Sequence, residues 1–228
     1  MARSERARSA LLDAAERLFA QQGIAQVSDR KVAEAAGNSN HSAVGYHFGG
    51  REGLLRALVD RHLAEIEERS RVMFDEGSAS LLDDVRALVV PVTEVMAELP
   101  RPTWRARFFS LALHDPSVSR LMRRTSEVAP TTARIGQSVG ARLSHLDPAV
   151  VRGRTMLMAH LVNSACAEIE EKAERDGEEP DWPGVGDFLS DAIAGMLLAP
   201  VSRPRSAAAT AARPAGAGGG AGAAGREG

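Results

Sequence analysis

The chain of 228 residues can hold one large domain or two small ones, and its 44% of hydrophobic residues are enough to bury a core. Alanine, leucine, arginine and glutamate dominate while aromatic residues reach only 4%, which favours an all-helical protein. The net charge of −2 excludes an overall basic field for nucleic acid, and the single cysteine, Cys166, excludes an intrachain disulfide and a CxxC metal site. The N-terminus lacks the apolar core of a signal peptide, and no apolar run reaches the roughly 18–20 residues that span a bilayer. We therefore expect a soluble, cytoplasmic protein with no membrane partner.

The N-terminal residues carry the start and stop signals of two helices. Apolar residues at three-to-four spacing predict a first helix over about 5–22, and Gly23 provides its left-handed stop. Ser28 is placed to cap a second helix, which Gly37 ends. Small alanines on the inward side of this second helix would let another helix cross it closely.

A third short helix is predicted directly after a polar turn. The turn at 37–40 is dense in residues that favour caps, and Asn40 is expected to cap a helix from His41 to His47. Gly49 and Gly50 then break the chain before a longer helix begins. Two short helices joined by a turn are typical of a helix-turn-helix, which places its second helix in the DNA major groove.

Longer and more acidic helices are predicted after residue 50. Ser80 and Asp83 form a box-like helix start, and Pro91 is expected to kink the helix that follows. The expected long helices cover about 51–75, 80–100, 103–115, 115–146 with a break at Pro130, 148–176 and 185–198.

We expect three parts of the chain: a helix-turn-helix domain at 1–50, a helical regulatory and dimerisation domain at 51–200, and a disordered tail at 201–228. The last part is almost wholly alanine, glycine, arginine and proline, so it cannot bury enough surface to order itself. It contains a GxGxxG match at 220–225, but no predicted strand precedes it, so we interpret the match as a coincidence of composition.

Three stretches together carry a family resemblance. They are Val27–Gly37 with its AEAAG ending, the aromatic close Tyr46-His47-Phe48, and the Arg51-Glu52-Gly53-Leu54-Leu55 start of the next helix. This combination resembles the TetR family of bacterial transcriptional regulators. Two features depart from the family pattern: the turn is one residue longer, and Gly45 stands where a tyrosine is common. Target preference is therefore not transferable from better-known members.

The resemblance implies an all-α protein with a three-helix DNA-binding domain and a helical ligand-binding and dimerisation domain. It implies a homodimer on a palindromic double-stranded DNA operator, a small-molecule effector, and repression as the usual outcome. We expect no cofactor, no metal and no catalytic residue. The last two long helices, 148–176 and 185–198, would form the dimer interface.

Residue types in the helix-turn-helix suit contacts with DNA. Arg51 and the hydroxyl of Tyr46 suit phosphates, and loss of Arg51 is expected to flatten the salt dependence by about one unit of slope. Ala43 would either face inward or touch a thymine methyl group, and Tyr46 has core packing as its alternative. The candidate DNA-binding residues are Arg30, Asn40, His41, Ser42, Ala43, Tyr46, His47 and Arg51.

Two further sets of residues are candidates for the effector pocket and the dimer interface, with ordinary core packing as the alternative for both. An apolar or amphipathic small molecule would suit the mixture of aromatic, methionine and polar groups in the first set. The pocket candidates are Phe74, Trp104, Phe108, Phe109, His114, Met122, Met158 and Asn163. The interface candidates are Met156, Leu157, His160, Leu161, Ser164, Phe188, Leu189, Ala192, Ile193 and Met196.

A helical enzyme and a structural adaptor are the alternatives to a regulator. His114-Asp115, His145 with Asp147, and the carboxylates Glu168, Glu170 and Glu171 are the residues that metal or acid–base chemistry would use. No His/Glu pair among them has convincing ligand spacing, and the glutamates are interpreted as a solvated helix face.

Overall fold

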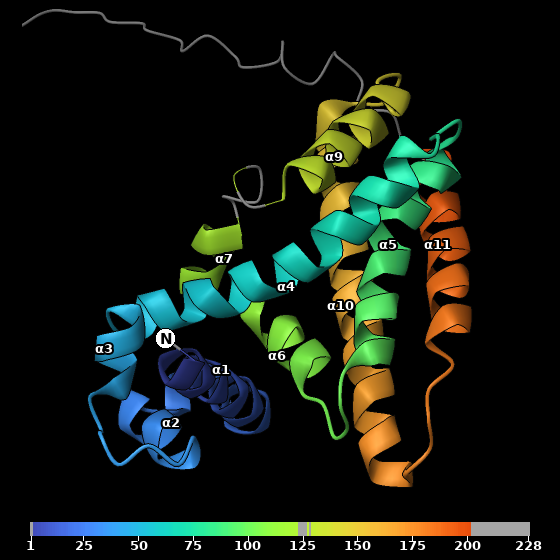
Figure 1. The fold of residues 1–228 in the computed structure, drawn as a ribbon. Helices are drawn as coiled ribbons and strands as arrows, with labels where there is room; N and C mark the ends of the chain where they lie inside the picture. Colours follow the sequence, from blue (N-terminus) through green and yellow to red (C-terminus); the bar gives the residue numbers. More distant parts are fainter. Residues whose placement is uncertain (1, 123–126, 128, 202–228) are drawn as a thin grey trace, which may run out of the picture. The chain divides into compact units, whose positions relative to one another are not determined.

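The first three helices and the start of the fourth pack around one apolar cluster. The computed structural model describes residues 2–122, 127 and 129–201, and every regular element in these ranges is a helix. The N-terminal helices are α1 (Ala2–Gln22), the one-turn 3₁₀ helix η1 (Ile24–Gln26), α2 (Asp29–Ala35) and α3 (Ala43–Phe48). These elements, called the head below, lie together at one end of α4 (Arg51–Asp75) (Figure 1).

Six further helices follow α4 in the described unit. They are α5 (Leu81–Glu98), α6 (Arg105–Ala112), α7 (Pro116–Met122), α9 (Pro130–Arg142), α10 (Pro148–Asp176) and α11 (Trp182–Leu198). Helices α5, α9, α10 and α11, called the body below, surround a second apolar cluster, and α11 packs along α5. Among the described residues, none of the helices has both the length and the apolar character needed to cross a bilayer.

Helix α6 belongs to both apolar clusters. Its Phe108 and Phe109 join the cluster of the head, where Phe108 lies 5.9 Å from the ring of Phe19 on α1. Ala106, at the start of the same helix, joins the cluster of the body. The head cluster also includes Val118 and Leu121 of α7. The head therefore shares its apolar core with α6 and α7. The predicted domain boundary at residue 50 remains a proposal.

Most expected helix bounds are confirmed, and local chemistry explains why. Ser28 accepts a hydrogen bond from the Lys31 amide, and Ser80 and Asp83 form a reciprocal capping box at the start of α5. Helix α4 covers the predicted range, and Gly49 has a φ of 71°, a left-handed conformation that ends α3 at little steric cost. Helix α10 also has the predicted bounds.

Several expected helices begin or end at other residues. Helix α3 begins at Ala43 rather than His41, because the Asn40 side chain accepts a hydrogen bond from the Ser42 amide and holds residues 40–42 in a turn. Helix α6 is shorter than predicted, and α11 begins at Trp182 rather than Val185. The predicted helix over 115–146 comprises α7 and α9, and α9 begins at Pro130, where the break was predicted; residues 123–126 and 128 lie outside the described ranges. The predicted tail from 202 onward also lies outside those ranges.

Candidate DNA-binding surface and its link to the body

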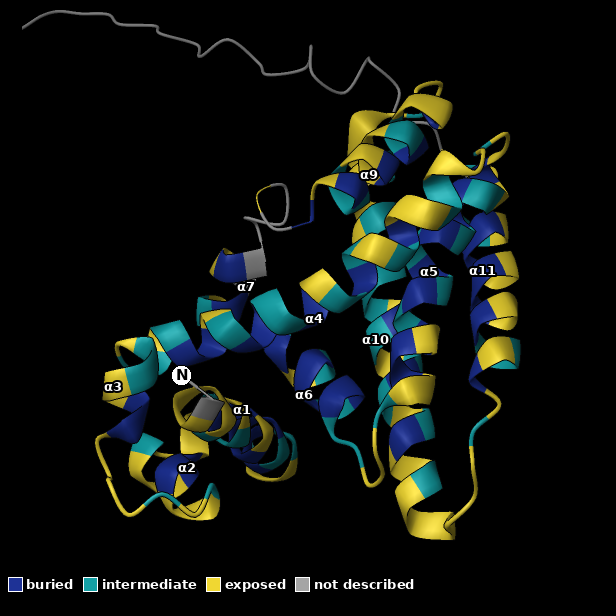
Figure 2. Cartoon of the chain, in the orientation of Figure 1, coloured by how far each residue is buried: buried dark blue, intermediate teal, exposed yellow. Residues whose placement is uncertain are grey.

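The outer face of α3 presents polar and aromatic groups to solvent. Tyr46 is 80% exposed and lies edge-on to His47, with 4.9 Å between the ring centroids. Ser42, four residues before Tyr46 and so on the same side of the helix, is exposed, as is Gly45. Figure 2 shows that this surface continues into the exposed turn between α2 and α3. Core packing of Tyr46 is therefore ruled out, and its hydroxyl is available for an external partner.

Two residues of the predicted DNA-binding set have other tasks in this structure. Ala43 is 1% exposed and packs in the head cluster, so the prediction of a thymine contact is wrong. Asn40 is exposed, but its side-chain oxygen is engaged by the Ser42 amide at 3.0 Å. Ala43 faces inward beside Val44, which is the other of the two orientations that the sequence allowed for it.

The remaining polar candidates surround the α3 face. Arg30 is exposed on α2 and donates to Glu34 one turn later at 2.8 Å. His41 is exposed in the turn, with its Nδ1 3.6 Å from the same carboxylate. Because both pairs are solvent-exposed, they contribute little to stability and leave Arg30 and His41 able to exchange Glu34 for another anion.

Arg51 points into the head instead of toward solvent. Its guanidinium lies 4.3 Å from the centroid of the Phe19 ring, donates to the Ile24 carbonyl and forms an ion pair with Asp29 at 3.4 Å. These contacts fasten α4 to α1, η1 and α2. We therefore revise the expectation that Arg51 contacts phosphate: its geometry assigns it to positioning the head on α4.

Helix α3 and helix α4 approach each other at Gly53. A Cβ atom built on Gly53 would lie 2.9 Å from the carbonyl carbon of Phe48 and closer still to its oxygen, well inside normal contact. The RE-G-LL start of α4 therefore contains a glycine because the last carbonyl of α3 occupies the space of a side chain. This close contact fixes the angle between α3 and α4.

A buried ion cluster joins the head to α4 and α6. Glu16 on α1 is 8% exposed and accepts hydrogen bonds from Arg61 of α4 and from Arg105 of α6, each at 2.7 Å. Arg105 is itself 3% exposed and reaches Glu65 at 2.6 Å. Burial raises the pKa of the Glu16 carboxyl, and the two guanidinium groups oppose that shift. The sequence showed no signal for this cluster, because its members come from three separate helices.

The start of α6 is held from the other side by α10. The buried carboxylate of Glu170 accepts hydrogen bonds from the backbone amides of Ala106 and Arg107 at 3.2 and 3.0 Å, and from the Arg107 guanidinium. Glu168 and Glu171 are exposed as predicted, whereas the interpretation of Glu170 as part of a solvated face is wrong. A carboxylate at a helix start satisfies free amides and complements the helix dipole. Helix α6 is thus fixed to the body by Glu170 and to the head by Arg105.

His62 is buried beside this cluster in its neutral form. Its ring lies 4.0 Å from the ring of Phe109, and its Nδ1 has no hydrogen-bond partner in the described part of the chain. Burial, together with the nearby guanidinium groups of Arg105 and Arg61, lowers the pKa of His62 to about 3. The unfolded chain binds a proton at this residue below pH about 6.5, whereas the folded chain does not.

Stability should therefore fall as the pH is lowered from about 6.5 toward 3, with about 2 kcal/mol lost between pH 7 and pH 5 from His62 alone. His62→Phe is expected to remove that contribution, since phenylalanine stacks on Phe109 and does not titrate. Urea unfolding at fixed protein concentration and several pH values measures how the free energy of unfolding changes with pH. His145→Phe, at an exposed position, is the control and should leave the slope in place. An unchanged slope in His62→Phe would contradict the assignment.

The structure does not bring the eight predicted pocket residues together. Phe108 and Phe109 belong to the head cluster, and Trp104 lies beside Arg17 of α1, 5.9 Å from its guanidinium. Phe74 is next to Arg134 of α9, and His114 stacks on His160 of α10 at 5.2 Å. Met158 packs against the body cluster, Asn163 donates to the Ala159 carbonyl, and the Met122 side chain is outside the described part. Ordinary packing explains most of this set.

A cleft that sequence reasoning missed lies against the start of α6. It has a volume of about 440 Å³, within the range of small-molecule sites. Its walls combine apolar and charged groups from the α5–α6 loop, from the end of α10 and from the loop before α11. The lining residues are Arg101, Pro102, Thr103, Glu170, Ala173, Glu174, Gly177, Pro180 and Trp182.

Comparisons with known proteins agree with this arrangement. Residues 11–58 match the family model described as bacterial regulatory proteins of the tetR family. Over 207 residues, the chain is 26% identical to an uncharacterized HTH-type transcriptional regulator of Mycobacterium tuberculosis, with 91% of each chain covered.

Two solved structures share the fold. One is a tetR family transcription regulator from Shewanella sp. PV-4, 19% identical, with 82% of this chain and 95% of that chain covered and a TM-score of 0.56. The other is a TetR family regulator from Marinobacter aquaeolei VT8, 18% identical, with 85% and 96% covered and a TM-score of 0.58. The chain therefore carries the DNA-binding helix-turn-helix of the tetR family of bacterial regulatory proteins over residues 11–58, within an all-helical fold that solved regulators of that family share.

Proposed function

We propose that this regulator is a ligand-responsive repressor that binds a palindromic operator as a homodimer in the cytoplasm. The observation that carries the DNA-binding part is the exposed face of α3, which presents Tyr46 opposite a buried side, with Ser42 exposed at the N-cap of the helix. An α-helix fits the major groove, where hydroxyl groups bond to base edges or to phosphates. His41, His47 and Arg30 at the edges of this face complete the proposed contact set, from which Ala43 and Arg51 are removed.

Tyr46→Ala is expected to weaken operator binding about tenfold, the effect of losing one good contact of about 1–3 kcal/mol. The test is a gel shift with the DNA upstream of the protein's own gene, at a stated salt concentration. Val72→Ala, at an exposed position of α4, is the control that should bind as the unchanged protein does. Equal binding to DNA with and without the palindrome would contradict the regulator proposal. Full operator affinity in Tyr46→Ala would contradict the proposal that α3 contacts the operator bases.

Exposed apolar residues on α10 and α11 support a second copy of the chain as the partner. Phe188 is 72% exposed and Met156 is 63% exposed, and large apolar side chains are rarely left in water in such numbers on neighbouring helices. Leu157, Leu161 and Leu198 continue the exposed surface. Leu189 and Ile193, also predicted for the interface, are instead buried in the body cluster. The interface proposal therefore rests on the outward residues of both helices.

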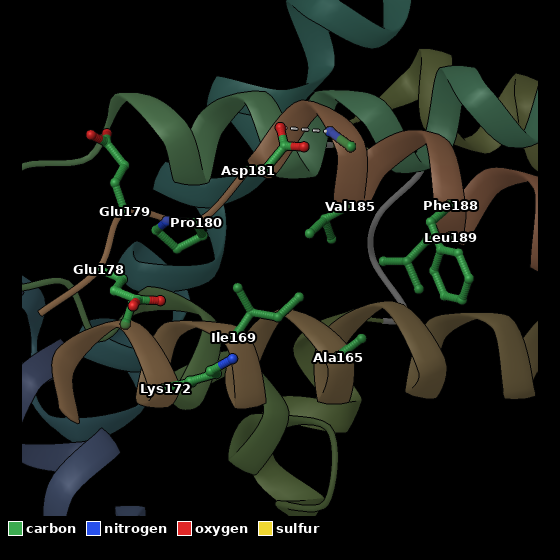
Figure 3. A pocket seen from close by; sticks show the side chains of 12 residues that line it. Ala165, Ile169, Lys172, Glu178, Glu179, Pro180, Asp181, Val185, Phe188 and Leu189 are labelled. Atoms are coloured by element: carbon green, nitrogen blue, oxygen red, sulfur yellow. Dashed lines mark hydrogen bonds between the residues drawn. The ribbon is translucent and has the colours of Figure 1, made fainter. Parts of the chain in front are cut away.

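A groove beside Phe188 gives this surface a self-complementary shape. The groove lies between α10 and α11 and has a volume of about 550 Å³, with Ala165, Ile169 and Val185 on its walls. Figure 3 shows Phe188 and Leu189 at one end of this groove, extending from α11 toward α10. In a two-fold dimer each subunit offers the same surface, so a projecting aromatic ring and a neighbouring apolar groove suit mutual insertion.

Phe188→Asp is expected to convert the dimer into monomers, because a carboxylate would have to be buried at the contact. Sedimentation or light scattering measures the mass, and operator affinity should fall along with it. The control is Val72→Asp, which places the same charge at an exposed apolar position on α4 and should leave the dimer intact. A Phe188→Asp protein that keeps the mass of a dimer would contradict this interface.

The effector is proposed to be a small apolar or amphipathic molecule that binds in the cleft lined by Thr103, Glu170 and Trp182. This site lies at the start of α6, whose Arg105 holds Glu16 of the head. A ligand that shifts α6 would alter the position of the head without contacting DNA, provided that it binds one position of α6 more tightly than the other.

A further inference from the structure

A second, more enclosed cleft lies between α4 and α7, away from the proposed effector site. It has a volume of about 300 Å³ and is formed by the first two turns of α4 and by α7. Its lining residues are Arg51, Glu52, Leu55, Arg56, Ser117, Arg120 and Leu121. Leu55 and Leu121 are buried, so the inner wall of the cleft is apolar.

The lining of this cleft carries an excess of positive charge. Among the described residues of the lining, three arginines and one glutamate give a formal charge of +2 (3 − 1). Arg51 is occupied by Phe19, Ile24 and Asp29, whereas Arg56 has a long ion pair of 3.4 Å with Glu52, one turn earlier on α4. Arg120 is exposed and has no ion-pair partner in the described ranges. Like charges beside an apolar wall repel one another more strongly than they do in open water.

We propose that this cleft is an anion site that accepts a phosphoryl group, with Arg56 and Arg120 as its binding residues. Guanidinium groups form paired hydrogen bonds with phosphate oxygens, and the formal excess of positive charge in the described lining favours an oxyanion. The volume is at the small end of ligand sites, which suits a phosphoryl group rather than a larger apolar molecule. Ser117 also lines the cleft and adds a hydroxyl donor.

Two sources can supply this group. Helix α4 begins directly after the reading helix α3, separated from it by Gly49 and Gly50, so the DNA backbone beside the operator is one source. A free phosphorylated small molecule is the other. Either occupant would join α7 to the start of α4 and so stabilise the base of the head. The DNA source depends on the proposed operator binding, while the anion site itself does not.

The site is tested on the full chain without DNA, with inorganic phosphate as the probe and chloride at equal ionic strength as the reference. Phosphate is expected to raise the melting temperature, since it binds the folded chain. The double variant Arg56→Gln/Arg120→Gln should bind phosphate about tenfold or more weakly, the effect of losing charged hydrogen bonds. Both side chains are exposed, so the variant should fold. Arg175→Gln, exposed at the end of α10, is the matched control that should bind phosphate normally.

Equal phosphate binding by the double variant and the unchanged protein would overturn the anion site, whatever the outcome with DNA. If the site exists, the salt dependence of operator binding identifies its occupant. A slope reduced by about two in the double variant assigns the cleft to DNA phosphates. The other outcome is that the double variant keeps the salt slope of the original protein, while free phosphate alters the operator affinity of the original protein alone. This outcome assigns the cleft to a small molecule. Failure of operator binding alone would count against the proposed function and not against this site.

Discussion

Arg105→Met is expected to destabilise the folded protein by about 3–5 kcal/mol, a large share of the stability of a typical domain. The guanidinium of Arg105 is buried between Glu16 of the head and Glu65 of α4, so its removal leaves the nearly buried Glu16 carboxylate with Arg61 as its remaining partner. Leaving a buried charge poorly paired costs more than the ion pair itself contributes. Chemical unfolding at fixed protein concentration measures the loss.

The second variant that defines this cluster is the double substitution Glu16→Met/Arg105→Met. Its loss should be smaller than the sum of the two single losses, because each single variant leaves an uncompensated group that the double variant lacks. Arg61 then retains Asp13, its partner at 2.6 Å on the exposed side. Arg101→Met, an exposed position four residues before Arg105, is the control and should change stability by less than about 0.5 kcal/mol. Additive losses would show that Glu16 and Arg105 are not energetically coupled.

The ion cluster also explains how the head can respond to the body. Arg105 and Glu170 hold opposite sides of α6, and the aromatic pair Phe108 and Phe109 fills the head cluster from the same helix. A displacement of α6 therefore cannot leave α1 and α4 unaffected, because packed cores and buried ion pairs resist gradual deformation. If the proposed repressor is released by an effector, α6 provides the physical connection between the ligand cleft and the reading helix.

Local sequence signals predicted the parts of the fold that depend on neighbouring residues. Ser28, Ser80 and Gly49 act within a few residues of their own positions, and each performs the predicted capping or terminating role. The start of α3 differs from the prediction because the Asn40 side chain closes a turn on the Ser42 amide rather than capping the helix.

Contacts between distant helices could not be read from the pattern. Glu16 and Arg105 are 89 residues apart, and Ala106 and Glu170 are 64 residues apart, so neither pair has a helical spacing that reveals it. Apolar periodicity also does not distinguish a side chain that packs within the chain from one that packs on a partner. For this reason Ile193 and Phe188 were placed in one predicted interface, although one is buried and the other exposed. The fold class was accessible from the sequence, whereas the coupling between its parts was not.

Gly53→Ala should disrupt the junction between α3 and α4 and abolish specific DNA binding. Alanine normally stabilises a helix by about 0.5–1 kcal/mol relative to glycine, because it restricts the unfolded chain. At Gly53 the added methyl group would meet the backbone carbonyl of Phe48, which cannot rotate away as a flexible side chain would. Relief requires a shift of α3 against α4, at an overpacking cost of about 1–3 kcal/mol.

The matched control is Gly136→Ala, at an exposed helical position of α9 where a Cβ atom meets nothing within 4 Å. This variant should gain about 0.5–1 kcal/mol and should bind DNA as before. The opposite signs of the two glycine substitutions separate a steric requirement at Gly53 from a general effect of helix propensity. Thermal unfolding and an operator gel shift measure both effects. A Gly53→Ala protein that is stabilised and still binds its operator would show that α3 does not need this close approach. The direction of α3 would then have to be set by the contact of Arg51 with the Phe19 ring alone.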